Sequence, residues 1–248
     1  MVLQNLKTEA VILATTDVFD ADRSYLILTR EFGKLRARGK GVRKPTSRLT
    51  GHLLAFLPTV LELVPTGGWY LITQAHIVER GVYPENSIDY LRQAELLSEG
   101  VDRLLEEGVP HPNLYDGLVY SLERLRDGQH QLLVVVEFFM KCMVTMGYRP
   151  ELVHCVVSGD DLDPNNLVWS SQLGGVGNRS TLSGVEGSGP TFPISSQTIV
   201  VLRQLVRPEF VAERIAMPEC VREETVRIVF DYLQTQIGKP LKTWQFSA

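Results

Sequence analysis

The stretch of sequence that decides the fold runs Leu28-Thr-Arg-Glu-Phe-Gly-Lys-Leu-Arg-Ala-Arg-Gly-Lys-Gly-Val-Arg-Lys44. From residue 34 to residue 40, Lys or Arg stands at every even position, and Leu, Ala or Gly at every odd position. Successive side chains of a β-strand point to opposite faces, so this alternation predicts a strand with one cationic face and one small, apolar face. The apolar face can enter the core of a barrel, which leaves the cationic face to solvent or to a ligand.

Around this strand, the first 80 residues read as short strands separated by turns. β-Branched and aromatic residues are frequent from Glu9 to Ile77, and turn-forming residues interrupt them at 20–22, 32–33, 39–41 and 65–68. Strands are expected near residues 7–15, 25–29, 34–40, 50–64 and 69–78. Five strands without an early helix are typical of a small closed barrel such as the OB-fold. We therefore expect an OB-like nucleic-acid-binding domain over residues 1–80.

The pattern changes to helical spacing after residue 82. Pro84 can open a helix, and apolar residues then recur at helical intervals from Ile88 to Leu97. Helices are expected at 84–107, 113–126 and 129–147, from Ser195 or Ser196 to about residue 206, and at 219–237 before Gly238. Residues 150–195 are rich in Gly, Ser, Asn and Pro, which predicts an irregular insertion that buries little surface of its own. The expected fold class is α+β, with a second, helical domain over residues 81–248.

Positive charge is concentrated around the decisive strand. Eight cations, opposed only by Glu31, lie within residues 30–48, although the whole chain has a net charge of −4. Such a local patch on an acidic chain indicates a surface aimed at a polyanion. The alternative is a solvated edge strand protected from aggregation, but one or two charges suffice for that purpose. The residues expected to contact DNA phosphates are Arg30, Lys34, Arg36, Arg38, Lys40, Arg43, Lys44 and Arg48.

Aromatic residues of the same region are candidates for stacking on bases, the contact by which many proteins hold single strands. Most of them are expected to lie in the barrel core instead. The candidates are Tyr25, Phe32, Phe56, Trp69 and Tyr70.

No pattern of catalytic or metal-ligating residues is complete. Asp161, Asp163 and Asn165 match the first positions of a calcium loop, but Asn166 and Gln172 replace its required Gly and Glu. The glycines from 174 to 189 fit no nucleotide-binding motif, the five histidines are scattered, and the three cysteines form no C-x-x-C pair. We expect a protein that is not an enzyme, with no cofactor and no bound metal.

The chain also lacks an apolar run near the roughly 20 residues that span a bilayer, and its start does not read as a signal peptide. The expectation is a cytoplasmic, nucleoid-associated protein without a membrane partner.

Six segments together resemble the RecO family of DNA-repair proteins. They are the decisive stretch itself, Glu9-Ala-Val-Ile-Leu with Ala21-Asp-Arg, Thr73-Gln-Ala-His-Ile, and the later Gly147-Tyr-Arg-Pro-Glu-Leu and Gly238-Lys-Pro-Leu-Lys-Thr. The resemblance covers nearly the whole chain. It implies an N-terminal OB-fold, a helical C-terminal domain, and a recombination mediator that binds single-stranded DNA and, more weakly, double-stranded DNA. It also implies strand annealing, partnership with RecR, recognition of the C-terminal tail of single-stranded-DNA-binding protein, and indirect help in loading RecA.

One departure from the family concerns zinc. Many relatives carry two C-x-x-C pairs in the insertion, whereas this chain reads Cys155-Val-Val-Ser158 and has no second pair. A structural zinc needs four N or S ligands, so we expect a zinc-finger-like but metal-free insertion.

Three other functions share some of these features. An RNA-binding OB protein would carry the same patch but recognise the ribose 2′-hydroxyl. A metal-dependent nuclease would use Asp160, Asp161 and Asp163 to cut the strand that it binds. A protein adaptor would turn the patch towards an acidic partner.

Overall fold

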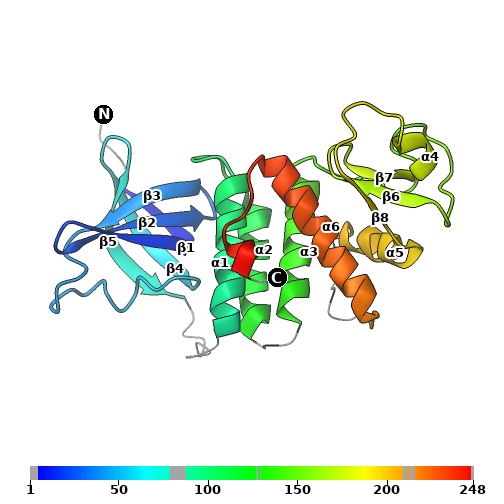
Figure 1. Ribbon diagram of the computed structural model, residues 1–248. Helices are drawn as coiled ribbons and strands as arrows, with labels where there is room; N and C mark the ends of the chain where they lie inside the picture. Colours follow the sequence, from blue (N-terminus) through cyan, green and yellow to red (C-terminus); the bar gives the residue numbers. More distant parts are fainter. Residues whose placement is uncertain are drawn as a thin grey trace. The chain divides into compact units, whose positions relative to one another are not determined.

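The computed structural model of the 248-residue chain describes residues 5–78, 88–126, 128, 130–208, 212 and 216–246. The chain divides into two compact units, Met1–Gly128 with Gln245–Ala248, and Gln129–Trp244. Figure 1 labels the helices and strands of both units. Each unit is described below by itself.

The first unit contains the five-stranded closed barrel that the sequence predicts. Its strands are β1 (Leu6–Val18), β2 (Asp22–Thr29), β3 (Gly33–Gly39), β4 (Pro58–Pro65) and β5 (Tyr70–Ile77). The barrel has the order β1-β2-β3-β5-β4, and antiparallel pairing of β4 with β1 closes it. The β3–β5 pairing is parallel, and all other neighbours are antiparallel. The barrel is OB-like, as expected.

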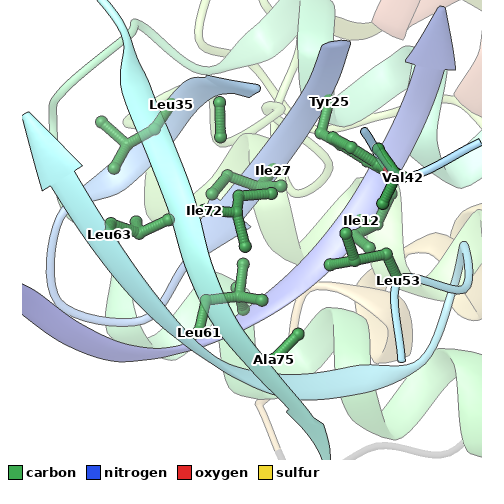
Figure 2. Packing of buried hydrophobic residues seen from close by; sticks show 12 residues of the cluster. Ile12, Tyr25, Ile27, Leu35, Val42, Leu53, Leu61, Leu63, Ile72 and Ala75 are labelled. Atoms are coloured by element: carbon green, nitrogen blue, oxygen red, sulfur yellow. The ribbon is translucent and has the colours of Figure 1, made fainter. Parts of the chain in front are cut away.

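The barrel core confirms the alternation read from β3. Leu35 and Ala37 point inwards and are buried, while Arg36 at the position between them is exposed. Figure 2 shows how side chains from all five strands fill the interior. The buried cluster comprises Ala10, Ile12, Tyr25, Ile27, Leu35, Ala37, Val42, Leu53, Leu61, Leu63, Ile72 and Ala75.

The connection between β3 and β4 differs from expectation, because the predicted strand over residues 50–64 begins only at Pro58. Residues 50–57 belong to a loop in which Leu53, Phe56 and Leu57 are buried as anchors. Val42 and Leu53 enter the barrel core, the Thr50 hydroxyl donates a hydrogen bond to the Val42 carbonyl, and Phe56 donates its backbone N–H to Ile12. Phe56 has a φ of 63°, which an extended strand does not allow. The prediction mistook buried loop anchors for strand residues.

Two helices complete the first unit. α1 (Ile88–Leu104) contacts β1 and α2 (Pro112–Arg126). The predicted start of the first helix, residues 84–87, lies outside the described residues. α1 buries Tyr90, Ala94, Leu97 and Val101, which share one face at helical spacing.

The second unit is built on three long helices near the predicted positions. They are α3 (Gln131–Thr145), α5 (Ser196–Leu205) and α6 (Glu219–Ile237). Ser195 caps α5 by accepting a hydrogen bond from the Thr198 backbone N–H, and Gly238 ends α6 in the left-handed conformation. α3 contacts both α5 and α6, and the rings of Phe139 and Phe230 meet edge to face at 5.9 Å. None of the helices in the described part of the chain is long and apolar enough to cross a membrane.

The insertion between α3 and α5 is more ordered than its composition predicts. It forms a three-stranded sheet of order β7-β6-β8, from β6 (Leu167–Ser170), β7 (Gly175–Asn178) and β8 (Thr191–Pro193), with the short helix α4 (Arg179–Leu182). Trp169 is fully buried, packs edge to face on Tyr232, and donates its indole N–H to Ser171, which donates to Asp231. The expectation that this segment buries little surface is wrong, because a single large aromatic side chain anchors the sheet to α6.

Candidate nucleic-acid interface

The eight predicted cations fall into two sets according to whether a carboxylate neutralises them. In the first set every cation has an acidic partner from a distant part of the same unit. The pairs are Arg30–Asp116 at 2.9 Å, Lys34–Asp102 at 2.9 Å, Arg36–Glu107 at 3.3 Å and Arg43–Asp17 at 3.6 Å. In the second set, Arg38, Lys40, Lys44 and Arg48 have no hydrogen-bonded or ion-paired carboxylate among the described residues. We call these four residues the cationic surface.

Among the eight predicted cations, Lys34 is the one that is buried, since its side chain is only 9% exposed. The ammonium group donates hydrogen bonds to the carbonyl and the carboxylate of Asp102. The strand does place Lys34 on the predicted outer face, but the chain around Glu107 and Gly108 covers it there, and Gly108 donates its N–H to the Lys34 carbonyl. Asp102 thus already neutralises most of the Lys34 charge, and we expect Lys34 to stabilise the fold more than it contacts DNA. Its assignment to the DNA-contacting residues stays a prediction.

Lys34→Met is expected to lower the free energy of unfolding by about 1–3 kcal/mol, because it removes a charged donor that satisfies two oxygens at a covered site. Urea unfolding followed by circular dichroism measures this loss. Lys40→Met, at the residue directly after β3, is the control, and its effect on the free energy of unfolding should stay within about 0.5 kcal/mol. Equal stability of the two variants would contradict the structural role.

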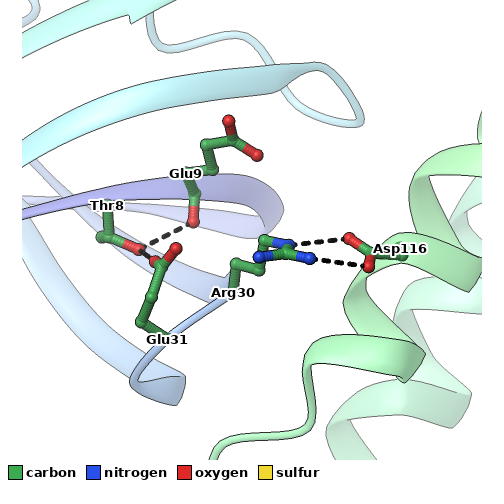
Figure 3. A network of polar contacts seen from close by, with 5 residues as sticks. All are labelled: Thr8, Glu9, Arg30, Glu31 and Asp116. Carbon is green, nitrogen blue, oxygen red and sulfur yellow. Dashed lines mark hydrogen bonds and ion pairs between the residues drawn. The ribbon is translucent and has the colours of Figure 1, made fainter.

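Arg30 is held by both oxygens of Asp116, at 2.9 and 3.0 Å (Figure 3). This bidentate pair joins the end of β2 to α2, and the hydrogen bond from Arg30 lowers the pKa of the Asp116 carboxyl. Close by, the Thr8 hydroxyl bonds to the Glu31 carboxylate. The Arg30–Asp116 pair therefore connects the barrel to α2, whereas the Arg36–Glu107 pair, in which the Arg36 side chain is 65% exposed, is a surface pair that contributes little to stability.

The cationic surface is continuous with the turn between β1 and β2. Arg43 donates its backbone N–H to the Ala21 carbonyl, and Gly41 donates its own to the Asp22 carboxylate. The Arg43 guanidinium also reaches Asp17 at the end of β1. These contacts fix the start of the loop after β3 against the β1–β2 turn. The cations of this loop therefore follow a segment of the backbone that is fixed by hydrogen bonds.

An exposed aromatic residue that the sequence analysis missed lies on this turn. Phe19 is 76% exposed, and the Arg38 guanidinium lies 5.6 Å from the centre of its ring. The same guanidinium lies 4.8 Å from the ring of Trp69, which is half-buried. A bulky aromatic residue in a polar hairpin turn, Asp17-Val-Phe-Asp-Ala-Asp22, was the available sequence signal.

The other predicted stacking residues are placed differently. Tyr25 and Phe56 are buried, so they are not available to bases. Phe32 and Tyr70 are half-buried and pack against the barrel core. Of the five candidates, Trp69 alone contacts a cation of the cationic surface among the described residues.

The acidic residues proposed for a nuclease belong to a surface turn. Asp163 accepts a hydrogen bond from the Asn165 backbone, and Asn178 bonds to the backbones of Asp161 and Asp163. Nowhere in the described ranges do three His, Cys, Asp or Glu side chains come together as a group able to hold a metal ion. Asp160, Asp161 and Asp163 therefore do not form the cation site that the nuclease alternative requires.

The residues around Cys155 do not fit the zinc of the related proteins. The Cys155 side chain is buried against Val168 and Leu182. Burial opposes ionisation of its thiol, but hydrogen bonds from the side chain and backbone of Ser158 contribute to lowering the pKa to about 7. A serine thus forms hydrogen bonds with the sulfur at the position where the family resemblance implies a second cysteine.

A closed five-stranded barrel with an exposed surface of cations and aromatic rings defines an OB-like domain of the class that commonly binds nucleic acids. Comparison with known families agrees with this class and narrows it. Residues 1–81 match the family model described as Recombination protein O N terminal, and residues 86–245 match Recombination protein O C terminal. The chain belongs to the RecO family of DNA-repair proteins. The predicted domain boundary at 80/81 stays a prediction.

Individual relatives are similar along most of their length. DNA repair protein RecO of Desulfitobacterium hafniense is 28% identical over 241 residues, which cover 95% of this chain and 86% of the relative. The RecO of Caldanaerobacter subterraneus is 26% identical over 244 residues, covering 98% and 97%. The RecO of Bacillus subtilis is 32% identical over 152 residues, covering 60% and 59%.

Proposed function

We propose that this protein is a non-enzymatic recombination mediator that binds single-stranded DNA through the cationic surface of its barrel. The observation that carries the proposal is that four cations from the end of β3 and the loop after it, on an OB-like barrel, have no carboxylate partner among the described residues. They are Arg38, Lys40, Lys44 and Arg48. Unpaired cations are costly to gather unless an anion neutralises them. A phosphate backbone supplies such anions at regular spacing.

The surface suits a protein that must hold DNA and pass it on. Contacts to phosphates are sequence-independent, weaken steeply with salt and allow sliding. Double-stranded DNA offers the same phosphates, so weaker duplex binding belongs to the proposal. By its family, the protein also promotes annealing and, together with RecR, helps to load RecA onto DNA coated by single-stranded-DNA-binding protein, whose C-terminal tail it recognises. These steps would take place in the cytoplasm, at the nucleoid.

Fluorescence anisotropy of a labelled single-stranded oligonucleotide across a salt series tests the proposal. We expect binding with a steep salt slope, a lower affinity for the matched duplex, and faster annealing when the complementary strand is added. A matched RNA strand should compete less well than DNA. Absence of binding at low salt would contradict the proposal, and stronger binding of RNA would replace it with an RNA-binding function.

A further inference from the structure

Phe19 combines two unfavourable features on the surface of the barrel. Its side chain is 76% exposed, and its backbone has a φ of 56°, in the left-handed region. A single exposed apolar residue is common and needs no explanation. A bulky residue in the left-handed region is rare, and such strain concentrates at ligand sites. Phe19, whose ring is close to Arg38 of the cationic surface, combines an exposed aromatic ring with a left-handed backbone.

The surroundings of Phe19 form a stack that is open to solvent. The Arg38 guanidinium lies near two rings, 5.6 Å from the centre of Phe19 and 4.8 Å from that of Trp69. The turn before Trp69 contains Gly67 and Gly68, where an added Cβ would meet no atom within 4 Å. The ring of Phe19 is therefore accessible to a flat ligand, and the turn before the half-buried Trp69 leaves room beside it.

Within the described residues, Arg38 contacts these rings and forms no ion pair with a carboxylate. Arg36, two residues earlier on the same face of β3, pairs with Glu107, and Arg43 after the strand pairs with Asp17. A guanidinium near the face of an aromatic ring is attracted by the ring and still attracts a phosphate. Arg38 thus joins the aromatic rings to the cationic surface.

We propose that Phe19, Arg38 and Trp69 form a stacking platform that binds the face of an unpaired base and thereby selects single-stranded over double-stranded DNA. This inference rests on the proposed function, since the cationic surface brings the strand to the platform. Base faces inside a duplex are covered by their neighbours, so only an unstacked nucleotide reaches Phe19. The phosphates hold either form of DNA, and the platform distinguishes them.

A consequence for annealing follows from this division. When a bound strand pairs with its complement, its bases stack within the duplex and leave the platform. The product then keeps only the salt-sensitive phosphate contacts, which release it more readily than the separate strand. Because the annealed duplex loses the stacking contacts, annealing favours release of the DNA product from the protein.

The test compares two labelled oligomers of equal length, one of ordinary thymidines and one of abasic deoxyribose, with the full-length protein. The two oligomers carry the same phosphates, so the ratio of their affinities reports contacts to bases. For the wild type we expect the ordinary strand to bind at least about fivefold more tightly. Phe19→Ala should reduce this ratio towards one while leaving the salt slope unchanged, and Phe19→Trp should restore it.

Tyr120→Ala is the matched control. Tyr120 is also an exposed aromatic residue of the first unit, and the Arg124 guanidinium lies 5.1 Å from its ring centre, but it lies on α2. Its replacement should leave both the ratio and the salt slope unchanged. An equal loss in Tyr120→Ala and Phe19→Ala would overturn the platform, as would a wild-type ratio near one.

Stability separates a binding role from a folding role. Phe19→Gly removes the strained backbone of the left-handed region, so its unfolding midpoint should equal or exceed that of the wild type while its ratio falls to that of Phe19→Ala. A marked drop in the midpoint of Phe19→Gly would overturn the inference, because Phe19 would then serve folding. If the wild type failed to bind either oligomer at low salt, the proposed function itself would fail.

Discussion

Replacing Lys40, Lys44 and Arg48 together by glutamine is expected to lower the affinity for single-stranded DNA on the order of a hundredfold at about 0.1 M salt. These cations have no acidic partner in the described part of the chain, so their charges are available to phosphates. Each phosphate contact on a single strand contributes about 0.7 to the slope of log affinity against log salt, so the slope should fall by up to about 2. Anisotropy titrations at several salt concentrations measure both quantities.

A second variant with the same change in net charge provides the control. Arg30, Arg36 and Arg43 are also cations of the predicted patch, but each faces a carboxylate at 2.9 to 3.6 Å. Their joint replacement by glutamine should reduce affinity several-fold less than the first variant. An equal loss would show that only total charge matters and that the division between paired and unpaired cations has no functional meaning. Unfolding curves of both variants establish that each is folded.

Gly33→Ala is expected to be the most damaging single substitution for stability, with a loss of about 3 kcal/mol or more. Gly33 has a φ of 70°, and an added Cβ would lie 2.1 Å from the Val109 carbonyl oxygen and 2.5 Å from its carbon. Those atoms belong to the backbone, so no side-chain rotation relieves the contact. The segment is further fixed by the hydrogen bond from Gly108 to Lys34. Chemical unfolding of the purified variant measures the effect.

Gly67→Ala separates the clash from the backbone conformation. Gly67 has a φ of 62°, similar to that of Gly33, but a Cβ there would meet no atom within 4 Å. The substitution should cost only the conformational strain, about 1 kcal/mol. If Gly33→Ala lost no more stability than Gly67→Ala, the close approach to Val109 would not be a determinant of the fold.

Local periodicity was sufficient to predict the barrel and the face of β3. The alternation of charge with Leu35 and Ala37 placed each side chain on its correct side of the sheet. The fate of each charge was not predictable, because the partners are distant in sequence. Asp102 is 68 residues from Lys34, and Asp116 is 86 residues from Arg30. Whether a cation is free depends on which loop or helix packs over it, and no local pattern contains that information.

The two errors in the fold have a common physical cause. Leu53 and Phe56 suggested a strand but are buried as loop anchors, and Trp169 supports a small sheet in a segment whose composition suggested an irregular loop. In each case a few large apolar side chains pack against residues distant in sequence, and this packing outweighs the secondary-structure propensity of the local sequence. Phe19 was missed for the opposite reason, because an aromatic residue in a turn is usually assigned to the core.

The covered position of Lys34 also determines how the protein responds to acylation. An amine-reactive reagent should modify the exposed Lys40 and Lys44 well before Lys34, whose nitrogen is bonded to two oxygens of Asp102. Acetylation removes the positive charge of a lysine. Modification of the accessible amines is therefore expected to weaken DNA binding and leave the barrel folded, so that binding and folding can be separated chemically within one short stretch of the chain.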